Sequence, residues 1–170
     1  ITAVGTGNNP ITFAKSQTEN WGVILVIGPN NETNVFENVV VEYGSGVSKY
    51  GFKSTGTISI HFSNAKITNS NFSQSSNDDA LNVKHGKVEI KNNHFGNTYS
   101  DAIDIDAVTG EISQNSFENI GLGKDLGDDS VLVTDFFKMR FISYVNRFGS
   151  DIFPPTFYPV RRADNTPAFR

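Results

Sequence analysis

The chain has 170 residues, a formal net charge of −4 and no cysteine. This length suits one domain with a substantial core, and the acidic balance argues against nucleic acid or an anionic membrane as the main partner. The absence of cysteine excludes disulfides, thiolate metal sites and thiol nucleophiles, and the longest apolar run, residues 23–27, is far too short to span a bilayer.

The first third of the chain contains short β-type runs separated by turn signals. The runs are residues 11–13, 23–27 and 39–43, and clusters of glycine, proline, asparagine and serine interrupt them at 28–31 and 44–46. No stretch before Asp135 has apolar residues at helical spacing over ten or more positions. We therefore expect almost no helix there. Because the chain begins at Ile1 without an initiator methionine, we interpret it as a fragment or a processed form.

Residues 57–117 hold one unit that is repeated nearly three times. The segment 58–60 (ISI) aligns with 81–83 (LNV) and 103–105 (IDI), at offsets of 23 and 22 residues. A second segment, 67–72, recurs at the same step in 90–95 and 112–117, and every copy ends in phenylalanine. A fixed period of this length with two short alternating segments is typical of a solenoid. The fold is therefore predicted to be all-β, a single-stranded parallel β-helix with coils of 22–23 residues.

Alternation within the repeat predicts which side chains are buried. Two inward sets are expected, and amide and hydroxyl side chains at the turns should bond to the backbone and to one another from coil to coil. The first inward set is Ile58, Ile60, Leu81, Val83, Ile103, Ile105, Val131 and Val133, and the second is Ala65, Ile67, Phe72, Val88, Ile90, Phe95, Ile112 and Phe117. The turn residues are Asn69, Ser70, Asn92, Asn93, Gln114 and Asn115.

The repeat becomes irregular after residue 117 and ends at Thr134. We interpret residues 121–127 as an insertion at a turn, after which 128–133 restore the pattern for one strand. Residues 135–170 do not match the repeat and hold all five arginines and four of the six prolines. The predicted division is a β-helix at 1–134, with regular coils at 57–134, and an irregular tail at 135–170. The tail is either a cap over the last coil or non-native sequence.

The repeat, with its inward aliphatic pairs, Asn-rich turns and closing phenylalanine, resembles the right-handed parallel β-helix proteins of the pectin-lyase-like superfamily. More narrowly, residues 77–83 (NDDALNV) and 100–105 (SDAIDI) are similar to coils of bacterial extracellular β-helix proteins and NosD-type periplasmic repeats. The resemblance covers residues 36–134 well and 1–35 loosely. It implies an exported protein, extracellular, at the cell surface or periplasmic, commonly associated with polysaccharides. The resemblance is also compatible with a longer parent protein, in which further β-helix coils would adjoin this chain.

The alternation also predicts an outward face on which chemistry could occur. One column contains His61, Lys84, Asp106 and Thr134, and the column beside it contains Ser59, Asn82, Asp104 and Leu132, with neighbours about 4.8 Å apart. The candidate catalytic residues are His61, Lys84, Asp104 and Asp106, and the candidate substrate-binding residues are Ser59, Asn82 and Thr134. Lys84 or His61 could abstract a proton beside a uronate carboxylate. Asp104, Asp106 and Asn82 could bind Ca²⁺.

Each of these assignments has a structural alternative. Lys84 and Asp106 could form a cross-strand ion pair on a solvated face. The aspartates that begin each strand, Asp79, Asp101 and Asp129, are interpreted as turn caps, with calcium binding between coils as the alternative.

Two enzyme classes of this superfamily have signatures that the chain lacks. The pectate lyases use an aspartate cluster with a catalytic arginine, whereas residues 1–134 contain no arginine. The galacturonan hydrolases carry Gly-His-Gly and Arg-Ile-Lys, whereas this chain has Lys-His-Gly-Lys at 84–87. We therefore favour a non-catalytic module that binds a glycan or another surface component. A lyase or glycoside hydrolase of acidic polysaccharide, or a fragment of one, and a purely structural spacer are the alternatives.

Overall fold

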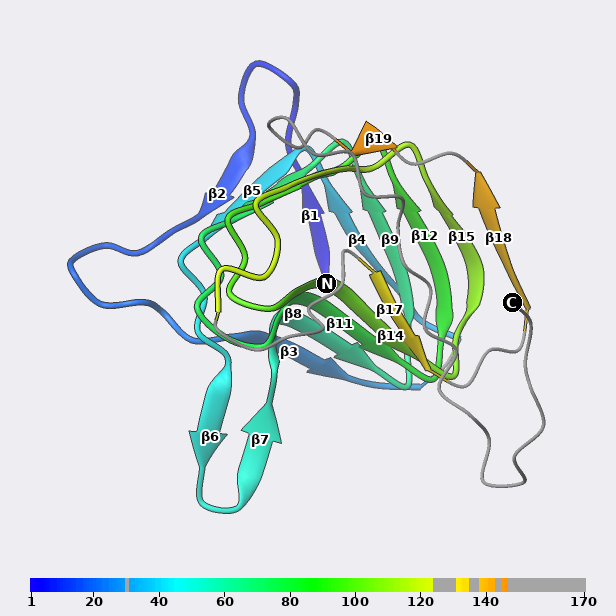
Figure 1. Ribbon diagram of the computed structural model, residues 1–170. Coiled ribbons are helices and arrows are strands. Elements are labelled where there is room, and N and C mark those ends of the chain that lie inside the picture. The colour runs from blue at the N-terminus through cyan, green and yellow to red at the C-terminus, as the bar shows by residue number, and fades with distance from the viewer. Residues whose placement is uncertain (30, 124–130, 135–137, 143–144, 147–170) are drawn as a thin grey trace.

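The computed structural model describes residues 1–29 and 31–123, together with the backbone of 131–134, 138–142 and 145–146. This part of the chain is all-β and contains no helix, as the sequence predicted (Figure 1). It follows that none of the described segments is a helix of the length and apolarity that a bilayer span needs.

Three parallel sheets contain nearly all the strands. Sheet 1 has the order β17 (Val131–Thr134), β14 (Asp101–Asp106), β11 (Asp79–Lys84), β8 (Gly56–His61), β3 (Ile24–Ile27). Sheet 2 has the order β1 (Thr2–Val4), β4 (Thr33–Glu37), β9 (Asn64–Thr68), β12 (Lys87–Lys91), β15 (Thr109–Ser113), β18 (Lys138–Ile142). Sheet 3 has the order β19 (Val145–Asn146), β16 (Ser116–Glu118), β13 (His94–Gly96), β10 (Asn71–Ser73), β5 (Val39–Glu42), β2 (Ile11–Phe13).

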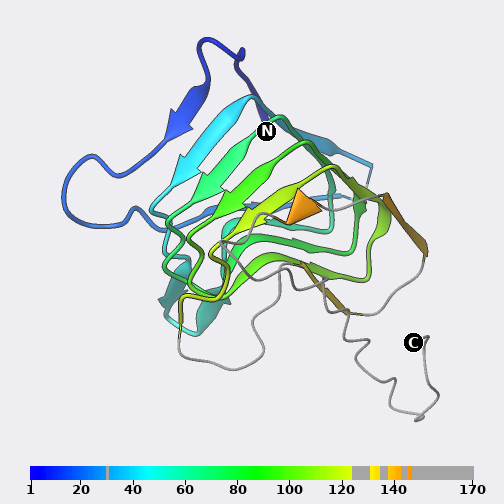
Figure 2. The same cartoon turned by 45° about the horizontal axis from the view of Figure 1, so that its top comes forward.

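The chain passes through sheets 1, 2 and 3 in turn, and we call each passage a coil. Strands β8 to β10, β11 to β13 and β14 to β16 are three consecutive coils, and their strands lie side by side in Figure 2. Leu81 pairs with Ile58 and Ile103, and Phe95 pairs with Phe72 and Phe117. The repeat register predicted from the sequence is therefore confirmed. Strands β3, β4 and β5 form the earlier, less regular coil.

The core lies between the three sheets and contains the described residues that were predicted to face inward, together with Ala3, Phe36, Val39, Val41, Ala80, Ala102 and Val108. The aliphatic side chains at 58, 60, 81, 83, 103 and 105 are fully buried, as are those at 67, 90 and 112. Phe72, Phe95 and Phe117 stack with ring centroids 4.9 Å and 5.6 Å apart. Each large buried side chain contributes roughly 1.5–3 kcal/mol by leaving water. Val131 and Val133 pair with Ile103 and Ile105, but their side chains lie outside the description.

Backbone conformation explains the amides at the turn between sheets 2 and 3. Asn38, Asn69, Asn92 and Gln114 occupy equivalent positions, with φ between 50° and 56°. Asparagine enters this left-handed region more readily than most residues because its short polar side chain bonds locally. One residue further on, the buried Asn93 and Asn115 each bond a carbonyl of the preceding coil, at 2.9 Å in both cases. The predicted amide ladder from coil to coil is confirmed.

Two features of the chain were not predicted from the sequence. Strands β6 (Val47–Lys49) and β7 (Phe52–Ser54) form an antiparallel hairpin that projects from the stacked coils beside the start of β8 (Figure 1). Strands β18 and β19, which lie within the predicted tail, pair in parallel with β15 and β16. Sheets 2 and 3 therefore extend beyond residue 134. The rest of the tail, and residues 124–127 of the predicted insertion, lie outside the described residues.

Candidate functional site

The outer face of sheet 1 brings the candidate residues together in the predicted columns. Asn82 pairs with Ser59 and Asp104, and Lys84 pairs with His61 and Asp106. In the fourth strand the backbone of Thr134 pairs with Asp106, and its side chain lies outside the description. We call the group formed by His61, Asp79, Asn82, Lys84, Asp104 and Asp106 the sheet 1 cluster.

Asn82 lies at the centre of this cluster and connects three of its side chains. Its amide nitrogen donates to Asp104 Oδ2 at 2.6 Å and to Asp79 Oδ2 at 3.3 Å. Its carbonyl oxygen lies 2.8 Å from His61 Nε2. Because the amide nitrogen faces carboxylate oxygens, the amide oxygen is left as the acceptor, so the proton of the imidazole is on Nε2. The bonds of Asn82 thus hold the orientation of the His61 ring.

The solvent exposure predicted for two residues of the second column, Ser59 and Asn82, is wrong. Ser59 and Asn82 were expected to face solvent, but they are 0% and 1% exposed. Ser54, at the end of the hairpin, donates a 2.7 Å hydrogen bond to Ser59 Oγ, and Asn82 is enclosed by its hydrogen-bonding partners. The candidate substrate-binding residues Ser59 and Asn82 therefore lie beneath the surface, where Asn82 bonds the cluster side chains and Ser59 bonds Ser54.

Asp79 belongs to the cluster although its sequence position predicted a turn cap. It is 3% exposed, and its carboxyl accepts from the Thr55 side chain and the Asn82 amide, so it does not act as a simple turn cap. Strict alternation would place residues 79 and 82 on opposite faces of the strand. The alternation is interrupted because Ala80 and Leu81 are both buried in the core. The signal for it in the sequence is a recurring Asp-Ala-aliphatic triplet, at 79–81 and again at 101–103, in which both apolar residues are buried.

Burial changes the ionisation of both carboxyl groups that Asn82 contacts. The pKa of Asp79 is raised to about 7, mainly because burial removes the carboxyl from water. The Thr55 hydrogen bond lowers this pKa, and the charges of Asp104, Asp101 and Asp78 contribute to the rise. Burial is also the main cause that raises the pKa of Asp104. There Lys84 opposes the rise and the Asp106 charge adds to it, with smaller lowering contributions from Asn82 and His61.

Lys84 and Asp106 form the outer edge of the cluster. Lys84 Nζ lies 3.9 Å from Asp106 Oδ2, and both side chains are about one-third exposed. This is the cross-strand ion pair that the sequence analysis gave as the alternative to catalysis. At such exposure, an ion pair contributes well under 1 kcal/mol. Both side chains remain accessible to a ligand on the face.

The residues considered for a Ca²⁺ site, Asp104, Asp106 and Asn82, have nitrogen groups beside their carboxylates. Asn82 turns its nitrogen toward Asp104, and the ammonium of Lys84 lies beside Asp106. Calcium binding there, which needs oxygen ligands, stays a prediction. Across the residues that the structure describes, no group of three or more histidine, cysteine or acidic side chains is arranged to hold a metal ion.

Exposed aromatic side chains lie at both ends of the sheet 1 strands. Phe62, which directly follows β8, is 50% exposed, and its ring stacks on His85 with centroids 4.8 Å apart and planes 11° apart. At the other end, the hairpin carries Tyr50, fully exposed, and Phe52, 44% exposed. Phe62 is therefore an exposed ring in the turn that follows His61 of the cluster.

Comparison with known proteins adds no assignment to this geometry. No protein-family model, curated protein or solved structure matches the chain.

Proposed function

We propose that the chain is a right-handed parallel β-helix module of an exported protein, and that the outer face of sheet 1 binds an acidic polysaccharide or a similar cell-surface component. The three in-register coils and the parallel pairing of all three sheets support the β-helix. The right-handed sense of the coils is inferred from general experience, because connections between parallel strands of one sheet are nearly always right-handed. A longer parent protein would extend the same stack of coils.

The observation that carries this function is the pre-organised polar surface of the sheet 1 cluster. Asn82 holds His61 and Asp104 in place, so little side-chain freedom is lost when a ligand binds. Lys84 supplies a partly exposed cation for a uronate carboxylate. The half-exposed Phe62 ring supplies a flat apolar surface for the face of a sugar. Together these groups can contact both the charged and the apolar parts of an acidic glycan.

The test is the binding of polygalacturonate and alginate oligomers to the purified protein, measured by titration calorimetry. Lys84→Gln should weaken binding about tenfold, because the cation that pairs with the uronate is lost. Lys66→Gln is the matched control, since Lys66 also lies 3.9 Å from a carboxylate, that of Glu89, but on sheet 2. Equal affinities for Lys84→Gln and the wild type would exclude the sheet 1 face as the binding surface.

A second candidate function is a polysaccharide lyase or hydrolase that uses the same face. The raised pKa of the partly exposed Asp104 favours it, because a carboxyl that keeps its proton at higher pH is suited to general acid catalysis. The buried Asp79 would act only through Asn82. Turnover of polygalacturonate, followed by unsaturated-product absorbance and reducing ends, that is lost in Asp104→Asn would establish the enzyme. Binding without turnover supports the recognition module.

A further inference from the structure

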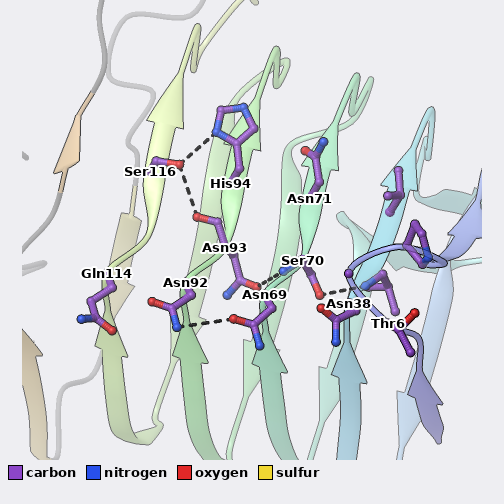
Figure 3. Close-up of a pocket in the computed structure, with 14 residues that line it drawn as sticks. Thr6, Asn38, Asn69, Ser70, Asn71, Asn92, Asn93, His94, Gln114 and Ser116 are labelled. Carbon is purple, nitrogen blue, oxygen red and sulfur yellow. Dashed lines mark hydrogen bonds between the residues drawn. The ribbon is translucent and has the colours of Figure 1, made fainter.

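A groove with a volume of about 520 Å³ lies at the corner between sheets 2 and 3, on a different side of the coils from the sheet 1 cluster. We call it the amide groove. One wall is formed by the turn amides of successive coils, Asn69, Asn92 and Gln114, and the other by Asn71, His94 and Ser116 from the strands of sheet 3 (Figure 3). Residues of the loop between β1 and β2 lie at one end of the groove.

The lining of the groove is polar but carries no fixed charge. Among the 14 described residues that line it, none is aspartate, glutamate, lysine or arginine, and His94 is the one titratable side chain. His94 Nδ1 lies 3.0 Å from Ser116 Oγ, and Asn92 donates a 3.4 Å hydrogen bond to Asn69 Oδ1. A primary amide offers two N–H donors and a carbonyl with two lone pairs, so one bond between neighbours leaves most of this capacity available to a ligand.

Asn71 lines the groove and has one side-chain atom without a hydrogen-bonding partner. Its Oδ1 atom is buried and has no hydrogen-bonding partner among the described residues. A buried acceptor without a partner costs roughly 1–3 kcal/mol, and native structures contain few of them. Asn71 lies between Val40 and His94 in the register of sheet 3, at a strand position where a β-branched apolar residue would avoid this cost.

We propose that the amide groove binds a neutral, hydroxyl-rich oligosaccharide that lies across the coils. Hydroxyl groups both donate and accept, as the amides do, and an uncharged ligand needs no counter-charge from the lining. The turn amides recur at the inter-strand spacing of about 4.8 Å, which suits a polymer with a short regular repeat. An added peptide strand fits less well, because β10 and β13 are already paired on both sides and offer no free backbone edge.

The experiment uses three neutral probes, cellohexaose, mannohexaose and xylohexaose, titrated into the intact protein by calorimetry. At least one should bind, and Asn92→Gly should weaken that binding about tenfold. Glycine keeps the left-handed conformation at this position, where φ is 56°, and removes only the amide. Asn119→Gly is the matched control, because Asn119 has φ 52° and donates to Asn97 Oδ1 in an equivalent amide pair outside the groove.

The control variant should bind the neutral probe as the wild type does. Lys84→Gln should also leave this binding unchanged, which separates the amide groove from the site proposed on sheet 1. The inference is overturned if no neutral hexasaccharide binds the wild-type protein, or if Asn92→Gly and Asn119→Gly have the same affinity.

Asn71→Val provides a second test in which stability and binding should change in opposite directions. Valine removes the unpartnered acceptor and suits a strand, so the melting temperature should stay the same or rise. Binding of the neutral probe should nevertheless weaken about tenfold. Wild-type affinity in this stable variant would show that the ligand does not contact Asn71 and would contradict the proposed site.

Discussion

Asp79 shows how the fold changes the chemistry of a single residue. Its carboxyl lies in a nearly closed space between the Thr55 side chain and the Asn82 amide, and three further aspartates act on it. Burial disfavours the charged form, so the native state binds this proton more tightly than the unfolded chain does. The cost of burying the carboxyl therefore depends on pH.

Asp79→Asn should remove this dependence of stability on pH, because asparagine does not ionise. With a native pKa of about 7 against 3.8 for an ordinary aspartate, the proton stabilises the native state fully below about pH 4. That stabilisation is lost as pH rises to 7. The variant, which is neutral throughout, should therefore gain stability relative to wild type over this window, by on the order of 4 kcal/mol at most. Urea unfolding at pH 4, 5.5 and 7 measures this gain. A constant difference between the two proteins would contradict the assignment.

Strands β10, β13 and β16 show how one repeated position becomes a continuous structural element. Phe72, Phe95 and Phe117 occupy the same place in three coils, and each ring stacks on the next. The middle ring has a stacked neighbour on both sides and is fully buried. A defect there therefore removes two stacking contacts and opens a cavity at the same time.

Phe95→Ala should accordingly lower the free energy of unfolding by about 3–5 kcal/mol, the usual cost of truncating a buried phenylalanine. Phe52→Ala in hairpin strand β7 is the control, because that side chain is 44% exposed. It should change stability by no more than about 0.5 kcal/mol. Chemical denaturation followed by circular dichroism measures both values. Equal losses would show that the stacked rings do not form the core.

The whole molecule is stabilised by contacts between one coil and the next. Each inner strand of sheet 1 pairs with the strands of the coils before and after it. In a structure of this kind, stability is approximately the sum of the terms for each repeat and for each interface between repeats. Damage inside one coil should therefore also destabilise the coils on either side of it.

Ile105→Asp tests this expectation by placing a carboxylate at a fully buried position of β14. An unpaired charge between stacked coils should unfold the described coils, with loss of the β signal in far-UV circular dichroism. Ile27→Asp makes the same chemical change in β3 of the same sheet, where the side chain is 63% exposed. It should melt as the wild type does. An unchanged melting curve for Ile105→Asp would show that the inward assignment is wrong.

The period, the strand register, the amide turns and the buried aliphatic and aromatic residues of the three regular coils could be predicted from the amino-acid sequence alone. These features depend on alternation within a strand and on residues one period apart, and both can be read directly from the order of the residues. Three features became visible only in the folded chain: the burial of Ser59 and Asn82, the place of Asp79 in the sheet 1 cluster, and the amide groove at the corner of sheets 2 and 3. These features depend on which segments cover a sheet face and on where the alternation of a strand is interrupted. Both are set by contacts between segments that lie far apart in the sequence, and the pattern within one strand does not specify them.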